Sequence, residues 1–300
     1  MKKVFLFGFL CSLFLAGFSQ STNTLLWRVS GEGLSKPSYL FGTMHLLCAD
    51  DIDLSDSLKS AISKADKVYL ELEMDNMFEM IGAMQHMQMR GDTTLADLLT
   101  ESEYKKVKRY FEENGSMLPF AMLETYKPLL VTALIAEQQA KTCDNMVAME
   151  QLIMKEAKNE GKKIKGLETM NYQLAIFDKI PYRFQAKQLY QMVSGETKDD
   201  GTEIKKLTEA YRSQKLDALE DITKSEDTGM KDFANILLYD RNANWAKQLI
   251  ELMSKNSLVV AVGAGHLPGK KGVISLLRQA GYKVEPVKNE MVKKVKGKEI

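Results

Sequence analysis

The chain lacks most of the compositional features that mark a specialised class of protein. Its 300 residues include only 6 prolines and 19 glycines, which excludes a collagen-like or linker-dominated chain. It has no marked excess of charge of either sign: 41 Lys and Arg face 40 Asp and Glu, so a protein built mainly to hold nucleic acid is not indicated. Apolar residues make up 45% of the chain, enough for a sizeable core. What remains is an ordinary globular protein of one large domain or two small ones.

Long apolar runs are absent except at the N-terminus, where the pattern is typical of a secretory signal peptide. Lys2 and Lys3 precede an almost uncharged apolar run over residues 4–18, and small polar residues follow it. A run of about 15 residues is short for a membrane span. We predict a signal peptide over residues 1–19 and an exported mature protein, periplasmic or extracellular, with no stable membrane anchor. An uncleaved N-terminal anchor is the alternative interpretation.

Cysteine is scarce, and the positions of its few residues favour a disulfide. One of the 3 cysteines, Cys11, lies in the expected signal peptide, which leaves Cys48 and Cys143. An even number of cysteines in an exported protein favours a disulfide between them, with two separate buried thiols as the alternative. The bond would close a loop of about 95 residues, worth several kcal/mol in the chain-entropy model.

Strand-like segments lie near both ends of the chain, and helical patterns fill the middle. The apolar run over 257–262 is typical of a buried strand, and the run over 67–72 follows a helical pattern, which predicts a βαβ step with a parallel strand pair. We predict an α/β fold: a central mixed, mainly parallel β-sheet built from N- and C-terminal strands, with a large helical block inserted between them. Residues 20–300 are expected to form a single domain, with helical insertions at about 76–160 and 170–255. Other strands are expected at 24–30, 38–41, 163–166 and 282–286, and helices at 55–65, 76–90, 94–99, 102–114, 118–141, 146–159, 171–179, 181–193, 202–212, 215–223, 230–238, 244–253 and 273–280.

Only 3 histidines are present, and two of them share one local pattern. Gly42-Thr43-Met44-His45 and Gly263-Ala264-Gly265-His266 each follow a strand-like run, and the glycine would let the backbone turn sharply at the strand end. In an α/β sheet the ligand crevice lies outside the carboxyl ends of the strands, so His45 and His266 are expected to face one cleft. Histidine is the commonest metal ligand and an acid/base near neutral pH.

Carboxylates follow two other predicted strands. Glu71 lies near the carboxyl end of its strand, and two histidines with one glutamate form a usual ligand set of metal hydrolases. A half-exposed edge strand would give the same alternation of apolar and acidic residues. Glu168 could be a second ligand, a general base or the N-cap partner of the next helix. Arg241 could stabilise an oxyanion or pair with a structural carboxylate.

These motifs together resemble those of the TraB/GumN family, which includes the Tiki metalloproteases. The matching stretches, in the same order from about residue 24 to 287, are 39–45, 69–73, 165–169, Arg241-Asn242 with Trp245, and 262–269. The resemblance implies an α/β core shared with erythromycin-esterase-like and haem-binding ChaN-like proteins. It also implies a metal-dependent protease that uses His45, His266, Glu71 and Arg241. It favours manganese or cobalt, whereas the softness of the ligands alone also allows zinc.

The favoured hypothesis is an exported metal-dependent hydrolase, a Tiki-like peptidase that acts on a peptide or protein. His45, His266 and Glu71 would hold a divalent metal that activates water, Glu168 would orient ligands or act as base, and Arg241 would stabilise negative charge. The alternative is a non-enzymatic module that binds haem or a peptide in the same cleft, and a third hypothesis is a scaffold without activity. Nothing in the sequence predicts an oligomeric state.

The third histidine, His86, lies in a methionine-rich segment. Met84, Met87 and Met89 surround it, and Met77 and Met80 precede it at helical spacing. Methionine and histidine in an exported protein can bind copper. We favour instead an amphipathic helix whose methionine face packs on the core or forms an adaptable lid.

Overall fold

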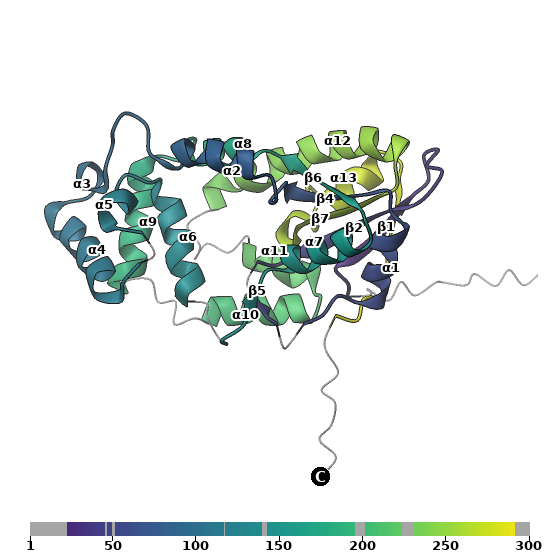
Figure 1. Ribbon diagram of the computed structural model, residues 1–300, viewed down its shortest axis with the longest axis horizontal. Coiled ribbons are helices and arrows are strands. Elements are labelled where there is room, and N and C mark those ends of the chain that lie inside the picture. Colours follow the sequence, from purple (N-terminus) through teal and green to yellow (C-terminus); the bar gives the residue numbers. More distant parts are fainter. Residues whose placement is uncertain are drawn as a thin grey trace, which may run out of the picture.

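A computed structural model describes residues 23–45, 47–49, 52–116, 118–139, 143–195, 202–223 and 231–291. The signal peptide expected over 1–19 lies outside these residues. The described chain forms a β-sheet flanked by helices, and a second group of helices forms a lobe at one end of the molecule (Figure 1). Among the described residues, no helix is both long enough and apolar enough to cross a membrane.

The central sheet has six strands and is mainly parallel, as predicted. Its order is β6-β4-β7-β2-β1-β8, and the strands are β1 (Leu26–Ser30), β2 (Ser38–Thr43), β4 (Lys67–Leu72), β6 (Lys163–Glu168), β7 (Leu258–Gly263) and β8 (Lys283–Pro286). Strands β2 and β4 are each parallel to β7, and β6 is parallel to β4, whereas β1 pairs antiparallel with β2 and β8. The carboxyl ends of four strands therefore meet at one edge of the sheet.

The predicted βαβ step is present, but its two strands are not neighbours. Helix α1 (Asp56–Lys64) connects β2 to β4, and β7 lies between these two strands. Strand β7 is the most apolar of the sheet, and all of its residues from Leu258 to Val262 are buried. A strand buried on both faces is most stable in the middle of a sheet, which explains the insertion of β7 between two strands that are adjacent in sequence.

A small second sheet fixes the segment that follows His45. Strand β3 (Leu47–Cys48) pairs antiparallel with β5 (Met146–Val147), and Cys48 forms a disulfide with Cys143 across a Cα–Cα distance of 6.1 Å. The predicted disulfide is thus confirmed. The helix expected from residue 146 begins only at Met149, as α7 (Met149–Asn159), because the two residues before Ala148 pair with β3 instead.

Helices cover the sheet and bury its apolar side chains. They are α1, α7, α10 (Thr202–Arg212), α11 (Leu216–Thr223), α12 (Asp240–Lys255) and α13 (Val273–Gln279). Helix α12 buries Trp245 and Leu249 completely against the sheet. The segment expected to be one helix over 230–238 is instead a 3-10 turn, η3 (Lys231–Phe233), and a π-helical turn, η4 (Asn235–Tyr239), that leads directly into α12.

The helical lobe has an apolar core of its own. Helices α3 (Leu95–Leu98), α4 (Glu101–Asn114), α5 (Phe120–Leu123), α6 (Pro128–Gln139) and α9 (Tyr182–Ser194) surround Val107, Phe111, Val131, Ile135 and Leu189. The segment over 118–141, which was expected to be helical with an interruption at Pro128, forms two helices, because Pro128 lacks the N–H that a continuous helix needs and so begins α6. Helix α4 ends at Gly115, whose φ of 68° favours glycine.

Two helices lie between the lobe and the sheet: α2 (Met77–Ala83), continued by the 3-10 turn η1 (Met84–Met87), and α8 (Met170–Phe177) (Figure 1). The helix expected over 76–90 is thus shorter than predicted. Its methionine face is mostly exposed, at Met77, Met80 and Met84, and only its end packs on a core, where Met87 and the buried Met89 contact the apolar core of the lobe.

Helix α8 is tied to the lobe by a buried charge. The ammonium of Lys127, 1% exposed, lies 2.8 Å from a carboxylate oxygen of Asp178 and donates a 2.8 Å hydrogen bond to the carbonyl of Leu174. Burial alone would raise the pKa of Asp178, but the hydrogen bonds from Lys127 and Tyr182 hold it below its usual range. Because α8 runs from the edge of the sheet to this ion pair, the pair fixes the helix relative to the lobe.

We predict that Lys127→Met destabilises the protein by up to about 3–5 kcal/mol, because it removes the buried cation of Asp178 and leaves this carboxylate with only the exposed guanidinium of Arg90, 2.9 Å away. The free energy of unfolding in urea measures this. Lys105→Met is the matched control, since Lys105 and Glu101 form an exposed pair on α4 whose loss costs within about 0.5 kcal/mol. Equal, small losses in both variants would contradict the structural role of the Lys127 pair.

Candidate active site

Four of the predicted site residues form one cluster at the carboxyl edge of the sheet. Glu71 is the next-to-last residue of β4, and Glu168 is the last residue of β6. Arg241 lies in the first turn of α12, and His266 ends the 3-10 turn η5 (Ala264–His266) that follows β7. The guanidinium of Arg241 lies between the two carboxylates: Nη2 is 2.6 Å from Glu71 Oε2 and 2.8 Å from Glu168 Oε2. The strand ends thus bring together residues that are far apart in sequence.

Arg241 uses its complete set of N–H donors within this cluster. Nε donates to both carboxylate oxygens of Glu168, and Nη2 donates to Glu168 and Glu71. Nη1 donates to the carbonyl of Leu237 at 3.1 Å and lies 3.3 Å from His266 Nε2. An arginine has five N–H donors, and here each has an acceptor. Arg241 therefore pairs with carboxylates of the protein, which is one of the two roles expected for it.

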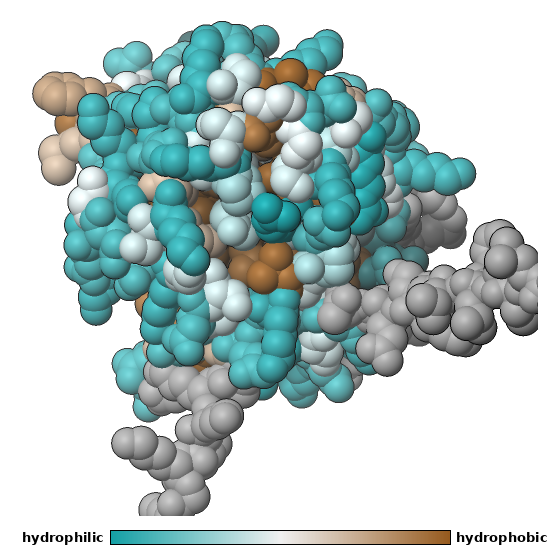
Figure 2. All heavy atoms as spheres, turned by 90° about the vertical axis from the view of Figure 1, so that its right-hand side faces the viewer, coloured by the Kyte–Doolittle hydropathy of each residue, from teal (hydrophilic) through white to brown (hydrophobic). Residues whose placement is uncertain are grey.

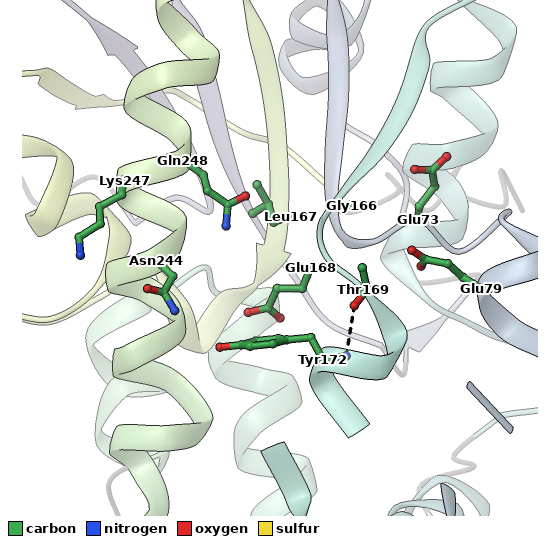
Figure 3. A pocket seen from close by; sticks show the side chains of 10 residues that line it. All are labelled: Glu73, Glu79, Gly166, Leu167, Glu168, Thr169, Tyr172, Asn244, Lys247 and Gln248. Carbon is green, nitrogen blue, oxygen red and sulfur yellow. Dashed lines mark hydrogen bonds between the residues drawn. The ribbon is translucent and has the colours of Figure 1, made fainter. Parts of the chain in front are cut away.

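Gln173 on α8 is a member of the cluster that sequence patterns did not indicate. Its Nε2 donates to Glu168 Oε2 at 3.0 Å and to Glu71 Oε2 at 3.2 Å. The helix starts directly after β6, so its first turn points back to the strand end. Thr169 is the N-cap of α8 and accepts from the amide of Tyr172 (Figure 3), so the N-cap role considered for Glu168 is wrong.

The hydrogen bonds of His266 define its tautomer. Arginine can only donate, so Nε2 must accept from Arg241, and the ring proton must be on Nδ1. Nδ1 in turn lies 2.6 Å from Asn242 Oδ1, while Asn242 Nδ2 donates to the carbonyl of Lys271. Burial lowers the pKa of His266 to about 4, so the imidazole is neutral near pH 7. The result is a neutral ring whose Nε2 lone pair accepts from Arg241 Nη1 and lies 3.9 Å from Glu71 Oε1.

The carboxylate of Glu71 is ionised although it is buried. Burial raises the pKa of Glu71, but the charge and hydrogen bond of Arg241 and a 2.8 Å hydrogen bond from the amide of Gly263 hold it below its usual value. A Cβ on residue 263 would lie 3.2 Å from Glu71 Oε1. This glycine therefore allows the backbone to approach a carboxylate.

The two motif glycines do not have the conformation that their place at a strand end predicts. Neither Gly42 nor Gly263 has a positive φ, so the expectation of a sharp, glycine-specific turn is wrong. Close packing explains them instead: a Cβ on Gly42 would lie 3.0 Å from that of Ala264, and Gly263 lies against Glu71. The two motifs thus pack against each other and against the carboxylate cluster.

His45 lies at the same edge but in a different local environment. Strands β2 and β7 pair with Thr43 opposite Gly263, so both histidines follow the same level of the sheet. The side chain of His45 is 72% exposed, and its Nδ1 is 3.0 Å from Oε1 of the buried Glu150. This hydrogen bond, and to a smaller extent the charge of Glu71, raises the pKa of His45.

Glu150 is a second member of the site that the sequence did not indicate. It lies in the first turn of α7, which the β3–β5 pairing and the Cys48–Cys143 disulfide hold beside the His45 segment. Its Oε2 is buried without a hydrogen-bond partner among the described residues. Glu150 lies within a helix rather than at the end of a strand of the central sheet, so strand-end reasoning does not find it.

A cavity of about 570 Å³ adjoins the cluster through Glu168. Figure 3 shows the carboxylate of Glu168 pointing towards α12, which contributes Asn244, Lys247 and Gln248, with the ring of Tyr172 beside it. Glu73 and Glu79 line the opposite side. The cavity is thus acidic and opens next to the ion cluster.

The residues of the cluster meet some, but not all, of the requirements of a site for a divalent metal ion. Within the described ranges, no three His, Cys, Asp or Glu side chains are grouped closely enough to hold a metal ion. His266 Nε2 and Glu71 Oε1 are 3.9 Å apart, a separation that one cation with bonds of ~2 Å can span. Two carboxylates against one guanidinium leave an excess of negative charge. A lone pair fixed by an outer hydrogen bond, as Asn242 fixes that of His266, is the usual preparation of a metal-binding histidine.

The fold and this cluster define an α/β protein with an ionisable site at the carboxyl edge of a mainly parallel sheet. The model of the TraB/PrgY/gumN family matches residues 25–286, and the chain belongs to this family.

Its curated relatives include Metalloprotease TIKI2 of Xenopus tropicalis, 24% identical over 321 residues, which cover 89% of this chain and 60% of that protein. Metalloprotease TIKI2 of Danio rerio is 23% identical over 88% of this chain and 61% of its own length. Metalloprotease TIKI1 of Homo sapiens is 23% identical over 88% of this chain and 62% of its own length. The chain therefore spans about six tenths of these relatives, as 60%, 61% and 62% show. No solved structure gives a significant match.

We predict that His266 makes stability depend on pH in metal-free protein. The unfolded histidine takes up its proton near pH 6.5 and the folded one near pH 4, so the unfolded state binds the additional proton between these values. The free energy of unfolding therefore falls as the pH is lowered through this window, on the order of 3 kcal/mol. His266→Ala should lack this part of the loss in urea unfolding with chelator, whereas His86→Ala should retain it. Equal pH slopes in the wild type and His266→Ala would refute the assignment.

We also predict that Glu150→Gln lowers the pKa of His45, because the charged hydrogen-bond partner of Nδ1 is removed. The ring C–H signals of His45 in an NMR titration measure this change. Glu113→Gln, an exposed substitution on α4, should leave the titration of His45 as it is in the wild type. An unchanged His45 titration in Glu150→Gln would show that the pair does not form in solution.

Proposed function

We propose that the protein is an exported metal-dependent peptidase. The observation that carries the proposal is the pair formed by neutral His266 and ionised Glu71, whose donor atoms lie 3.9 Å apart beside an acidic cavity. Membership of the TraB/PrgY/gumN family and relatives named metalloproteases support the same activity. The Cys48–Cys143 disulfide supports export, because such bonds persist in oxidising compartments.

In this proposal His266 and Glu71 hold the divalent cation, and His45 is the third ligand through Nε2, the ring atom that Glu150 does not engage. Manganese or cobalt is the favoured metal and zinc the alternative. A bound divalent cation lowers the pKa of water towards neutrality and so supplies a nucleophile. Asn242 keeps the lone pair of His266 on Nε2, and Glu150 orients the ring of His45.

The other charged residues of the cluster keep it ionised and in place. Glu168 has both oxygens engaged by Arg241 and Gln173, which favours an orienting role over that of a general base. Arg241 holds Glu71 ionised and presents Nη1 towards His266 Nε2. Because this N–H is adjacent to the proposed metal position, Arg241 is also placed to stabilise negative charge that develops on a peptide carbonyl oxygen.

The test is hydrolysis of a mixture of fluorogenic peptides by protein loaded with manganese, cobalt or zinc. We expect activity that chelator abolishes, and a loss of at least about 100-fold together with loss of bound metal in His266→Ala and Glu71→Gln. His86→Ala is the control and should retain metal and activity, because His86 is exposed on η1, away from the sheet edge.

Two results would contradict the proposal. Unchanged activity in His266→Ala, with metal lost in His86→Ala, would move the site to the methionine-rich segment. A Soret band on addition of haem, without peptide turnover under any metal, would favour the non-enzymatic binding module.

A further inference from the structure

Strand β6 is one of the two edge strands of the central sheet. The strand order places β6 at one end of the sheet and β8 at the other, so each has a neighbour on one side alone. Every second residue of an edge strand turns its N–H and C=O groups away from the sheet, where they can pair with another extended chain. Among the described residues, no strand pairs with the outer side of β6. This side therefore presents a row of backbone donors and acceptors to a ligand.

The carboxyl-terminal part of β6 also lines the cavity that adjoins the ion cluster. Residues 166–169 line it, between α12, whose Gln248 side chain is directed towards the strand, and Glu73 and Glu79 on the opposite side (Figure 3). A Cβ on Gly166 would lie 2.7 Å from both the carbonyl oxygen of Glu168 and the amide of Glu73, so packing requires glycine here. No side chain then covers this stretch of backbone, which is where a second chain can approach closely.

The charges of the cavity do not select a strongly charged ligand. Glu73 and Glu168 are each in an ion pair already, and the other charged residues of the lining, Glu79 and Lys247, have opposite signs. Amide and hydroxyl groups donate and accept hydrogen bonds, as the peptide groups of a polypeptide backbone do. The side chains of this kind in the lining are those of Thr169, Tyr172, Asn244 and Gln248. The lining therefore fits a ligand rich in uncharged peptide groups.

The end of the molecule opposite the lobe offers little apolar surface to such a ligand. It is mostly hydrophilic, with apolar residues visible in the gaps between polar ones (Figure 2). Pairing with a sheet edge does not need an apolar surface, because hydrogen bonds between main chains provide the affinity. The outer side of β6 is thus a recognition surface of a different kind.

A second copy of the chain fits this edge less well than a short peptide. Lys163 and Lys165 are exposed on β6, and exposed lysines on an edge strand commonly prevent two sheets from pairing edge to edge. A second sheet with its flanking helices would bury these ammonium groups, which costs free energy. A single extended segment leaves them in water. The occupant that fits is therefore one polypeptide segment and not a second folded domain.

The cavity leads from β6 to the proposed metal position. Glu71 of β4 and His266, which follows β7, flank that position, and β6 is the neighbour of β4. Adjacent strands are about 4.8 Å apart, so a chain paired with the outer side of β6 lies about 10 Å from β4. An extended chain covers about 3.3 Å per residue. A polypeptide on β6 therefore reaches the cluster within about three residues.

We propose that the outer side of β6 binds the polypeptide substrate as an added strand, through backbone hydrogen bonds that end about three residues from the bond that is cleaved. This inference rests on the proposed peptidase function and names its substrate class, which is extended or unfolded polypeptide segments. Because main-chain groups make the contact, many side chains are accepted along the paired residues, whereas helical segments are excluded.

Binding without turnover tests the inference. The probe is a fluorescein-labelled octapeptide of alternating threonine and valine, and its fluorescence anisotropy is measured with the full chain in chelator. A second peptide is N-methylated at every second residue, which leaves one complete edge of donors, and a third is N-methylated at every residue, which leaves none. We expect the first two peptides to bind alike and the third to bind at least about 10-fold more weakly.

Hydrogen exchange shows where the peptide pairs. We expect the bound peptide to slow amide exchange in residues 163–169, whereas β8, the edge strand at the other end of the sheet, is the matched control and should exchange as before. Gln248→Trp places an indole in the cavity and should weaken binding by about 10-fold or more. Glu251→Trp, at an exposed position of α12 that does not line the cavity, should leave binding unchanged.

The outcomes separate this inference from the proposed function. Binding that slows exchange in β6, without peptide hydrolysis under any metal, supports strand addition and overturns the peptidase. Hydrolysis with the same KM and kcat in the wild type and Gln248→Trp supports the peptidase and overturns strand addition. Equal or absent binding of the three peptides, or slowed exchange in β8 instead of β6, also overturns strand addition. A dimer in sedimentation whose formation protects β6 without any peptide would identify a second copy as the occupant and would overturn it as well.

Discussion

The ion pairs of Arg241 with Glu71 and Glu168 are the interaction on which the site depends. Burying three charges has a large desolvation cost, which is offset only when every donor and acceptor is used. Arg241 meets this condition, because its N–H groups bond to both glutamates, to the carbonyl of Leu237 and to His266 Nε2. The cluster joins β4, β6 and α12 at one edge of the sheet. The order of the parallel strands therefore determines which charged side chains meet there.

The same pairs set the electrostatic character of the edge. They keep Glu71 ionised, while burial keeps His266 neutral, and its Nε2 lone pair accepts from Arg241 Nη1. In the present arrangement the guanidinium is the cation beside His266 Nε2 and Glu71. Arg241 therefore lies directly beside the position that a divalent metal would take. Binding of the metal to His266 Nε2 would lengthen or replace the contact between Arg241 Nη1 and His266 Nε2.

Much of this arrangement could be predicted from the sequence, because parallel strand ends converge. The doubled Gly-x-x-His pattern predicted that His45 and His266 face one cleft, and the pairing of β2 with β7, with Thr43 opposite Gly263, brings both motifs to the same edge of the sheet. Glu150 and Gln173 could not be predicted in this way, since they reach the site from helices placed by tertiary packing. The methionine face of α2 was expected to pack on the core or to form a lid. Helical periodicity defines such a face but not what covers it, and here most of the face is exposed.

The central claim, that His266 and Glu71 hold a divalent cation, is tested most directly by the anomalous scattering of crystals grown with manganese. The account predicts a peak between His266 Nε2 and Glu71 Oε1, with the contact of Arg241 Nη1 to His266 lengthened and Asn242 still bonded to Nδ1. A peak among the methionines around His86, or an Arg241–Glu71–His266 cluster that remains unchanged with manganese bound elsewhere, would contradict it.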